Sequence, residues 1–127
     1  MITLDSSAWM HYFMNGPLLE VYAARMPKNP KSIVTPVIIL YEVCRNLMRN
    51  QVGEELLNVC LSEIEKTHLV DVTKELSYHA ADLSLKNKLS MADSIIYATA
   101  DVFGSKLLTS DSDFKNLPNV EYIPSEE

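Results

Sequence analysis

Short apolar runs alternate along this chain with longer segments in which apolar residues recur every three or four positions. The short runs cover residues 2–4, 32–34, 69–72, 107–109 and 120–123, and most of them end at polar or turn-forming residues, which is typical of buried strands. The longer segments are typical of helices that pack one face on a core. Because strands and helices alternate, the pattern predicts a parallel sheet covered by helices on both faces.

Start and stop signals bound the predicted helices. Pro17 is suited to the first turn of a helix, and Thr35 followed by Pro36 combines an N-cap residue with a proline at the first helical position. Ser90 is a further N-cap residue, and Gly104 is a natural C-terminal stop. Counted with their caps, the predicted helices span residues 17–26, 35–49, 54–66, 73–88 and 90–104.

The second predicted helix carries an apolar stripe on one face and a charged group on the other. Glu42, Arg45 and Arg49 share the charged face, so Glu42 can form a surface ion pair at helical spacing. Ile38 and Ile39 nevertheless make the first turns apolar all round, which indicates that something also covers the face of Glu42. Surface pairing and a role in a site therefore both stay open for Glu42. The predicted core stripe consists of Val37, Leu40, Tyr41, Cys44, Leu47 and Met48.

Four acids interrupt or directly adjoin the apolar segments. Asp5 and Asp111 each end an apolar strand, and the carboxyl ends of parallel strands are where ligands bind in such sheets. Glu42 lies inside an apolar helix, and Asp93 opens another. A buried acid costs stability unless it is paired, hydrogen-bonded or holding a cation, so the four acids predict one shared site. Oxygen-only ligands favour a hard divalent ion such as Mg²⁺ or Mn²⁺.

Each of these acids also has a structural explanation. Asp5 can begin a turn, and Asp93 in a first helical turn caps amide groups and favours the helix dipole. Asp111 and Asp113 can open a solvated loop, and Asp111 is the stronger site candidate because it lies nearer the strand.

Composition limits the class of protein. The chain has 127 residues, of which 47% are apolar and 22% charged, which fits one globular domain over residues 1–127 and excludes disorder. A net charge of −6 argues against a general nucleic-acid coat protein but allows an enzyme that grips a few phosphates locally. The sequence shows neither a membrane-length apolar run nor a signal-peptide pattern, so we expect a cytoplasmic protein with no membrane association.

Cysteine and histidine chemistry are not indicated. Cys44 and Cys60 lack metal-ligand spacing and are expected to be free thiols. His11, His68 and His79 stand apart from the acids and from one another, so metal-free histidine catalysis is not expected.

Residues 2–7, 40–45, 89–100 and 107–114 together resemble a known family in order and spacing. The chain resembles PIN domains, and specifically the small toxin ribonucleases of VapBC toxin–antitoxin modules. The resemblance covers nearly the whole chain. It implies a three-layer α/β/α sandwich with a central parallel sheet of about five strands, which agrees with the pattern of apolar residues.

The resemblance also implies a Mg²⁺- or Mn²⁺-dependent site that hydrolyses RNA phosphodiester bonds. Asp5, Glu42, Asp93 and Asp111 stand at the family's acidic positions. Asp5, Asp93 and Asp111 are then the expected metal ligands, direct or through water. Glu42 is expected to be either a ligand or the base that orients the attacking water.

Five further residues receive expected roles. Ser6 and Thr109 occupy small-hydroxyl positions that would steady the site, and Asp113 resembles an accessory acid. Arg45 and Arg49 are candidates for contacts with RNA phosphates, with pairing to Glu42 or a solvated helix face as the alternative.

The family implies an antitoxin partner and a homodimer. The supply of apolar residues on the predicted helices also predicts a dimer, because a thin sandwich of this size does not readily cover them all. A catalytically silent PIN-like module that binds RNA or protein is the alternative to the nuclease. The apolar residues that predict the dimer are Tyr22, Met26, Leu47, Met48, Leu56 and Leu57.

Overall fold

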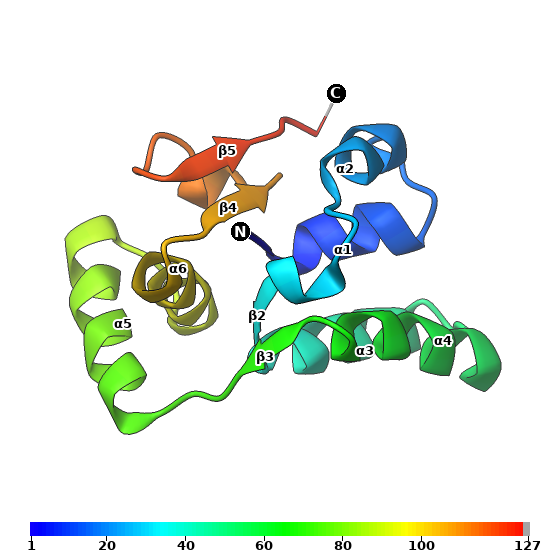
Figure 1. Cartoon of the computed structure of the whole chain (residues 1–127), viewed down its shortest axis with the longest axis horizontal. Helices are drawn as coiled ribbons and strands as arrows, with labels where there is room; N and C mark the ends of the chain where they lie inside the picture. Colours follow the sequence, from blue (N-terminus) through cyan, green and yellow to red (C-terminus); the bar gives the residue numbers. More distant parts are fainter. Residues whose placement is uncertain (126–127) are drawn as a thin grey trace.

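A computed structural model describes residues 1–125 and shows five short parallel strands between helices (Figure 1). Strands β1 (Ile2–Leu4), β4 (Lys106–Thr109) and β5 (Val120–Tyr122) form one sheet in the order β1-β4-β5. Strands β2 (Val34–Pro36) and β3 (His68–Val70) form a second, two-stranded sheet. A parallel bridge between Ile2 and Ile33 joins the two, so the strands run in the order β3-β2-β1-β4-β5.

Helices cover both faces of this sheet. Successive residues of a strand point to opposite faces, and both Thr3 and Leu4 of β1 are fully buried, as are Leu107 and Leu108 of β4. The predicted α/β/α sandwich with a parallel sheet is therefore confirmed. The helices are α1 (Ser6–Phe13), α2 (Leu19–Arg25), α3 (Ile38–Arg49), α4 (Glu54–Glu65), α5 (Lys74–Asn87) and α6 (Met91–Phe103), with 3₁₀ turns η1 (Pro30–Ser32) and η2 (Ser112–Phe114). None of the helices within residues 1–125 has the length and apolar character needed to cross a bilayer.

Caps set the ends of the last two helices as predicted. The Thr73 hydroxyl accepts a hydrogen bond from the Leu76 amide at 3.2 Å and begins α5. The Ser90 hydroxyl accepts from the Asp93 amide at the same distance and begins α6. Gly104 ends α6 with φ +62°, a left-handed conformation that glycine adopts without strain.

The predicted start of α3 is wrong. Thr35 and Pro36 belong to strand β2, and the helix begins at Ile38 without a side-chain cap. The Thr35 hydroxyl instead accepts from the Thr67 hydroxyl at 2.8 Å, and the Val37 amide donates to the Val70 carbonyl at 2.9 Å. Pairing with β3 therefore outweighs the local signal of a cap residue followed by proline. The predicted start of α2 is also early, because this helix begins at Leu19 and not at Pro17.

The predicted core face of α3 is wrong in part: Leu47 is buried as predicted, but other residues of the predicted stripe are exposed. Ile39, Val43 and Leu47 are fully buried, whereas Tyr41 and Met48 of the predicted stripe are 68% and 61% exposed. Two apolar stripes run along this helix, and periodicity alone does not decide which one meets the sheet. The true orientation leaves Tyr41, Cys44 and Met48 as an apolar stripe on the outer side, with Cys44 half-buried. We call these three residues the outer stripe of α3.

Two of the residues expected to drive dimerisation lie inside the monomer. Tyr22 and Leu47 are fully buried, and Tyr22 forms a 2.6 Å hydrogen bond between its hydroxyl and that of Ser110. Leu56 and Met48 of the same set are 53% and 61% exposed. Cys60 is buried, and both cysteines are free, as predicted.

Candidate active site

Asp5 and Thr109 meet at the carboxyl edge of the sheet because β1 and β4 are adjacent parallel strands. Leu4 pairs with Leu108 in register, so the residues that follow each strand lie side by side. The Thr109 hydroxyl donates to Asp5 Oδ2 at 2.5 Å and accepts from the Asp111 amide at 2.9 Å. One hydroxyl group therefore fixes the positions of both acid-bearing segments, which supports the steadying role expected for Thr109.

Asp5 is 3% exposed and is the N-cap of α1, a helix that the sequence pattern did not predict. Its Oδ1 accepts from the Ala8 amide at 3.0 Å and from the Ser7 hydroxyl at 2.7 Å. The pKa of Asp5 is raised to about 6, chiefly because the group is buried; the hydrogen bonds from Thr109, Ser7 and Ala8 oppose this rise, and the negative charge of Asp111 adds to it. The carboxyl group is thus rigidly held and poorly solvated.

Ser7 is a site residue that sequence reasoning missed. Its hydroxyl donates to Asp5 and accepts from the Ser110 amide at 3.2 Å, so it ties α1 to the loop after β4. The sequence Asp5-Ser6-Ser7 is typical of an ordinary turn, so no pattern in the sequence marks Ser7 as a site residue.

Asp93 lies in the first turn of α6, facing the other acids. Burial is the largest cause that raises its pKa, to about 7, and neighbouring negative charges add to the effect. In order of size, those charges belong to Asp111, Asp5, Glu42 and Asp113. Because all four act on one carboxyl group, the predicted acids converge on one region of the molecule.

Glu42 is half-buried on α3, and burial raises its pKa while the nearby Ser6 hydroxyl lowers it. Its Oε1 atom is buried and has no hydrogen-bond partner among residues 1–125. Within the same part of the chain, Glu42 forms no ion pair with Arg45 or Arg49, so surface pairing does not explain it. An unpartnered buried carboxylate oxygen costs stability and is suited to a cation or a bound water.

Three carboxylates come close enough to hold a cation. Asp93, Asp111 and Asp113 each offer one oxygen, and these oxygens lie within 4.8 Å of one another. We call these residues the carboxylate cluster. Asp111 also accepts from the Asp113 amide at 2.9 Å, which orders turn η2. Asp5 stands outside the cluster and contributes through its charge, whereas Asp113, expected only as an accessory acid, belongs to it.

The donor set of the cluster fits Mg²⁺ or Mn²⁺. Hard divalent ions prefer carboxylate oxygen and keep several waters, so three partly solvated carboxylates are an appropriate set. Burial and the neighbouring negative charges raise the pKa of Asp93, and a bound cation would offset both effects.

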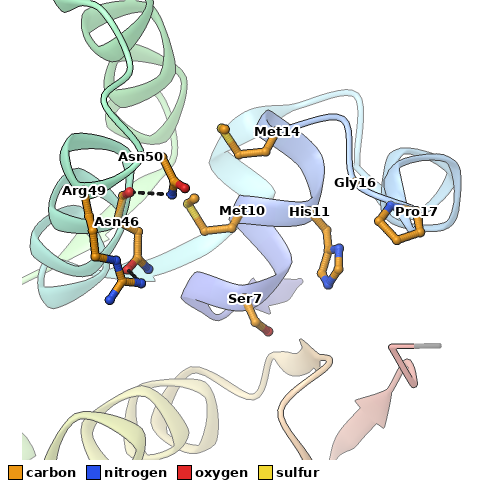
Figure 2. A pocket seen from close by; sticks show the side chains of 9 residues that line it. All are labelled: Ser7, Met10, His11, Met14, Gly16, Pro17, Asn46, Arg49 and Asn50. Carbon is orange, nitrogen blue, oxygen red and sulfur yellow. Dashed lines mark hydrogen bonds between the residues drawn. The ribbon is translucent and has the colours of Figure 1, made fainter. Parts of the chain in front are cut away.

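The two arginines lie at increasing distance from the acids along α3. Arg45 lines a pocket of about 300 Å³ together with Ser6, Tyr41, Glu42 and Asn46. Arg49 lies one turn further along and lines a second pocket, where its guanidinium donates to Asn46 Oδ1 at 3.1 Å (Figure 2). Two positive charges therefore extend outward from the acidic site on one side.

The histidines take no part in the carboxylate cluster described for residues 1–125. His79 contacts Asp101 at 2.7 Å, and His68 packs edge-on against Phe103. His11 stacks on Tyr22. The acids, rather than a histidine, are therefore the candidates for the chemistry of this site.

Comparison with known proteins extends these observations. The sequence model of a family described as the PIN domain matches residues 2–120. Comparison with curated proteins gives no significant match.

Solved structures share the fold at low sequence identity. A toxin–antitoxin complex from Klebsiella pneumoniae superposes with a TM-score of 0.80 at 18% identity, covering 97% of this chain and 100% of that chain. Mycobacterium tuberculosis VapC20, described as a Sarcin-Ricin loop cleaving toxin, gives 0.76 at 20% identity, covering 98% and 100%. VapBC2 from Rickettsia felis, bound to a fragment of its promoter DNA, gives 0.76 at 17% identity, covering 96% and 98%. At these identities the likeness shows the fold.

Proposed function

Because the chain belongs to the PIN-domain family, we propose that it is a metal-dependent endoribonuclease and the toxin of a type II toxin–antitoxin pair. The observation that carries the proposal is the convergence of carboxylates, in which oxygens of Asp93, Asp111 and Asp113 lie within 4.8 Å of one another. The buried Asp5 is not part of this cluster, but its negative charge acts on Asp93. The toxin in the Mycobacterium tuberculosis structure is described as cleaving the Sarcin-Ricin loop, which supports RNA as the substrate class.

The roles of the residues follow from their surroundings. The carboxylate cluster would hold Mg²⁺ or Mn²⁺, which supplies charge neutralisation at the phosphate and a lowered pKa for water. Hydrogen bonds from Ser7 and Thr109 hold Asp5 in place, and Asp5 adds its negative charge to that of the cluster.

Glu42 is the candidate general base. Its unpartnered Oε1 takes the proton that the attacking water loses as the water oxygen bonds to phosphorus. The bond between phosphorus and the leaving oxygen then breaks, and the leaving oxygen takes a proton from solvent. The raised pKa of Glu42 makes it a stronger base than an ordinary carboxylate. Arg45, in the same pocket, is placed to contact a phosphate oxygen, and Arg49 the next phosphate along the strand.

Cleavage assays on single-stranded and looped RNA test this proposal. We expect cleavage with Mg²⁺ or Mn²⁺ and none in EDTA, and we expect Asp93→Asn to lose at least about a hundredfold in rate. Asp82→Asn is the matched control, because Asp82 is an exposed acid that pairs only with Lys86 on α5. Cleavage that survives EDTA, or an undiminished Asp93→Asn variant, contradicts the proposal. Metal-dependent RNA binding without cleavage identifies a catalytically silent module instead.

We also propose an antitoxin partner, because three of the similar structures are toxin–antitoxin complexes. A groove of about 640 Å³ between α1, α2 and α4 is the surface that suits it. Phe13, Leu56 and Val59 give the groove an apolar floor, and Glu20 and Glu63 give it an acidic rim, so the partner segment should be apolar with basic flanks. We expect the product of a small adjacent gene to copurify with the wild-type protein and to be lost with Leu56→Arg.

A homodimer is proposed on the outer stripe of α3. Tyr41 and Met48 at its two ends are 68% and 61% exposed, and an exposed apolar stripe at helical spacing is typical of an interface. We propose that the protein is located in the cytoplasm and acts on RNA there.

A further inference from the structure

A second pocket adjoins the acidic site on the side of α1 and α3. It has a volume of about 500 Å³, is open to solvent and includes Ser7, whose hydroxyl also holds Asp5 (Figure 2). Asn46 lines both this pocket and the smaller pocket that contains Glu42 and Arg45. The two pockets therefore meet at Asn46. We call the larger one the α1–α3 pocket.

The charge of the α1–α3 pocket differs from that of the rest of the molecule. The chain carries a net charge of −6, and Ser7 of the pocket donates to the buried acid Asp5. The lining residues nevertheless include no acid, and Arg49 is the one residue among them with a permanent charge. This setting favours part of an anionic chain over a cationic ligand.

Two amides on α3 present a matched donor and acceptor. Asn46 Oδ1 accepts from the Arg49 guanidinium, and one N–H of Asn50 Nδ2 donates to the Asn46 carbonyl at 2.7 Å. Within residues 1–125 this leaves Asn46 Nδ2 as a donor and Asn50 Oδ1 as an acceptor. A donor beside an acceptor complements the edge of a nucleobase, which presents the same two functions in reverse.

The opposite wall suits the flat face of a base. Figure 2 shows the Met10 side chain reaching from α1 toward Asn46 and Asn50, with Met14 one turn further along. Thioether sulfur packs favourably against aromatic rings, and methionine adapts its shape to what it contacts. At about 500 Å³ the pocket also has the volume of ordinary small-molecule sites.

We propose that the α1–α3 pocket binds the base of a nucleotide beside the scissile phosphate, and that Asn46 and Asn50 select that base. The inference rests on the proposed function, since it assigns a specificity subsite to the same RNA-cleaving site. Arg49 holds the phosphate of the selected nucleotide, and Met10 packs on its ring. Occupation by a side chain of a protein partner is the competing outcome of the test.

Binding measured in EDTA tests the pocket without catalysis. Fluorescence anisotropy with labelled short RNA homopolymers of the four bases is expected to show a preference of about tenfold for one base. Asn46→Ala and Asn50→Ala should each reduce that preference to less than about twofold, while Asn58→Ala, at an exposed amide on α4, should keep it. Equal affinity for all four homopolymers, or an unchanged preference in both pocket variants, overturns the inference.

Cleavage mapping separates this inference from the proposed function. On a randomised RNA with Mg²⁺, the wild type should favour one base at one position next to the cut, and the two variants should lose that preference. Cleavage whose sequence preference the variants leave intact refutes the pocket and retains the nuclease. Base-selective binding without any cleavage refutes the nuclease and retains the pocket as an RNA-binding site. If neither RNA binding nor cleavage occurs but Asn46→Ala releases a copurifying protein, the pocket belongs to the partner interface.

Discussion

Thr109 links the two strand-end acids through one hydroxyl group. Replacement by valine keeps the shape of the side chain but removes the donor to Asp5 Oδ2 and the acceptor for the Asp111 amide. A buried carboxylate that loses a hydrogen bond costs about 1–3 kcal/mol. We therefore expect Thr109→Val to lower the free energy of unfolding by that amount in chemical denaturation.

Thr99→Val is the matched control for this prediction. Thr99 is equally buried, but its hydroxyl donates only to the Ile95 carbonyl within helix α6. The control is expected to cost less than about 1 kcal/mol. Equal losses in the two variants would show that the Thr109 hydroxyl has no special part in the site.

The raised pKa values of Asp5 and Asp93 predict how stability depends on pH. These pKa values are about 6 and about 7, above the ordinary 3.8, so the folded protein keeps protons that the unfolded chain has already released. The contribution of these groups to stability is complete below about pH 4 and is lost as the pH rises toward 7. In EDTA, Asp93→Asn should show a flatter decline than the wild type between those limits. Parallel melting-temperature profiles for the two proteins would contradict the pKa shift of Asp93.

At the residue scale, the sequence located the acids but not their supports. Asp5, Glu42, Asp93 and Asp111 could be identified because each stands where burial without a partner is costly. Ser7 could not, because its importance depends on contact with Ser110, which is distant in sequence. The place of Asp113 in the carboxylate cluster depends on turn η2, whose geometry has no clear sequence signal.

At the element scale, helix α3 shows the limit of periodicity. The alternation of strands and helices predicted the sandwich, because it depends only on the order of elements. The rotation of α3 depends on which of two apolar stripes packs better on the sheet, and its start depends on pairing between β2 and β3. Both are tertiary effects that override local signals.

Neighbouring residues on α3 test the observed rotation. Leu47 is fully buried and Met48 is 61% exposed, so Leu47→Ala should cost about 2–5 kcal/mol of unfolding free energy. Met48→Ala should cost less than about 1 kcal/mol when unfolding is measured on the monomer. Comparable losses in the two variants, measured by urea denaturation, would instead support the stripe predicted from the sequence, which placed both residues in the core.

At the scale of the whole molecule, the outer stripe of α3 predicts self-association. We expect light scattering at micromolar concentration to give twice the monomer mass of 14.3 kDa. Tyr41→Glu should return the protein to the monomer, because a charge in an apolar interface is costly to bury. Tyr78→Glu, at a similarly exposed tyrosine on α5, is the control and should stay dimeric. A wild-type protein that is only monomeric at this concentration would contradict the proposed homodimer.

The central claim is that separate elements bring their acids to one cation site. Asp111 comes from the end of β4 and Asp93 from the start of α6, and their oxygens lie within 4.8 Å of each other. Two charges at that distance repel by roughly 3 kcal/mol at an effective dielectric of about 20, before water and counter-ions reduce the effect. Asp111→Asn removes one of the charges while nearly preserving the shape of the side chain.

The most direct measurement is the melting temperature of wild type and Asp111→Asn in EDTA and in Mg²⁺. Asp111→Asn should melt at or above the wild-type temperature in EDTA, because repulsion is relieved. It should lose most of the rise that Mg²⁺ gives the wild type, because binding to the native state is what raises the melting temperature. Asp82→Asn should keep that rise. A variant that melts clearly lower than the wild type in EDTA and keeps the full Mg²⁺ rise would show that Asp111 is a structural residue and that the acids do not form a metal site.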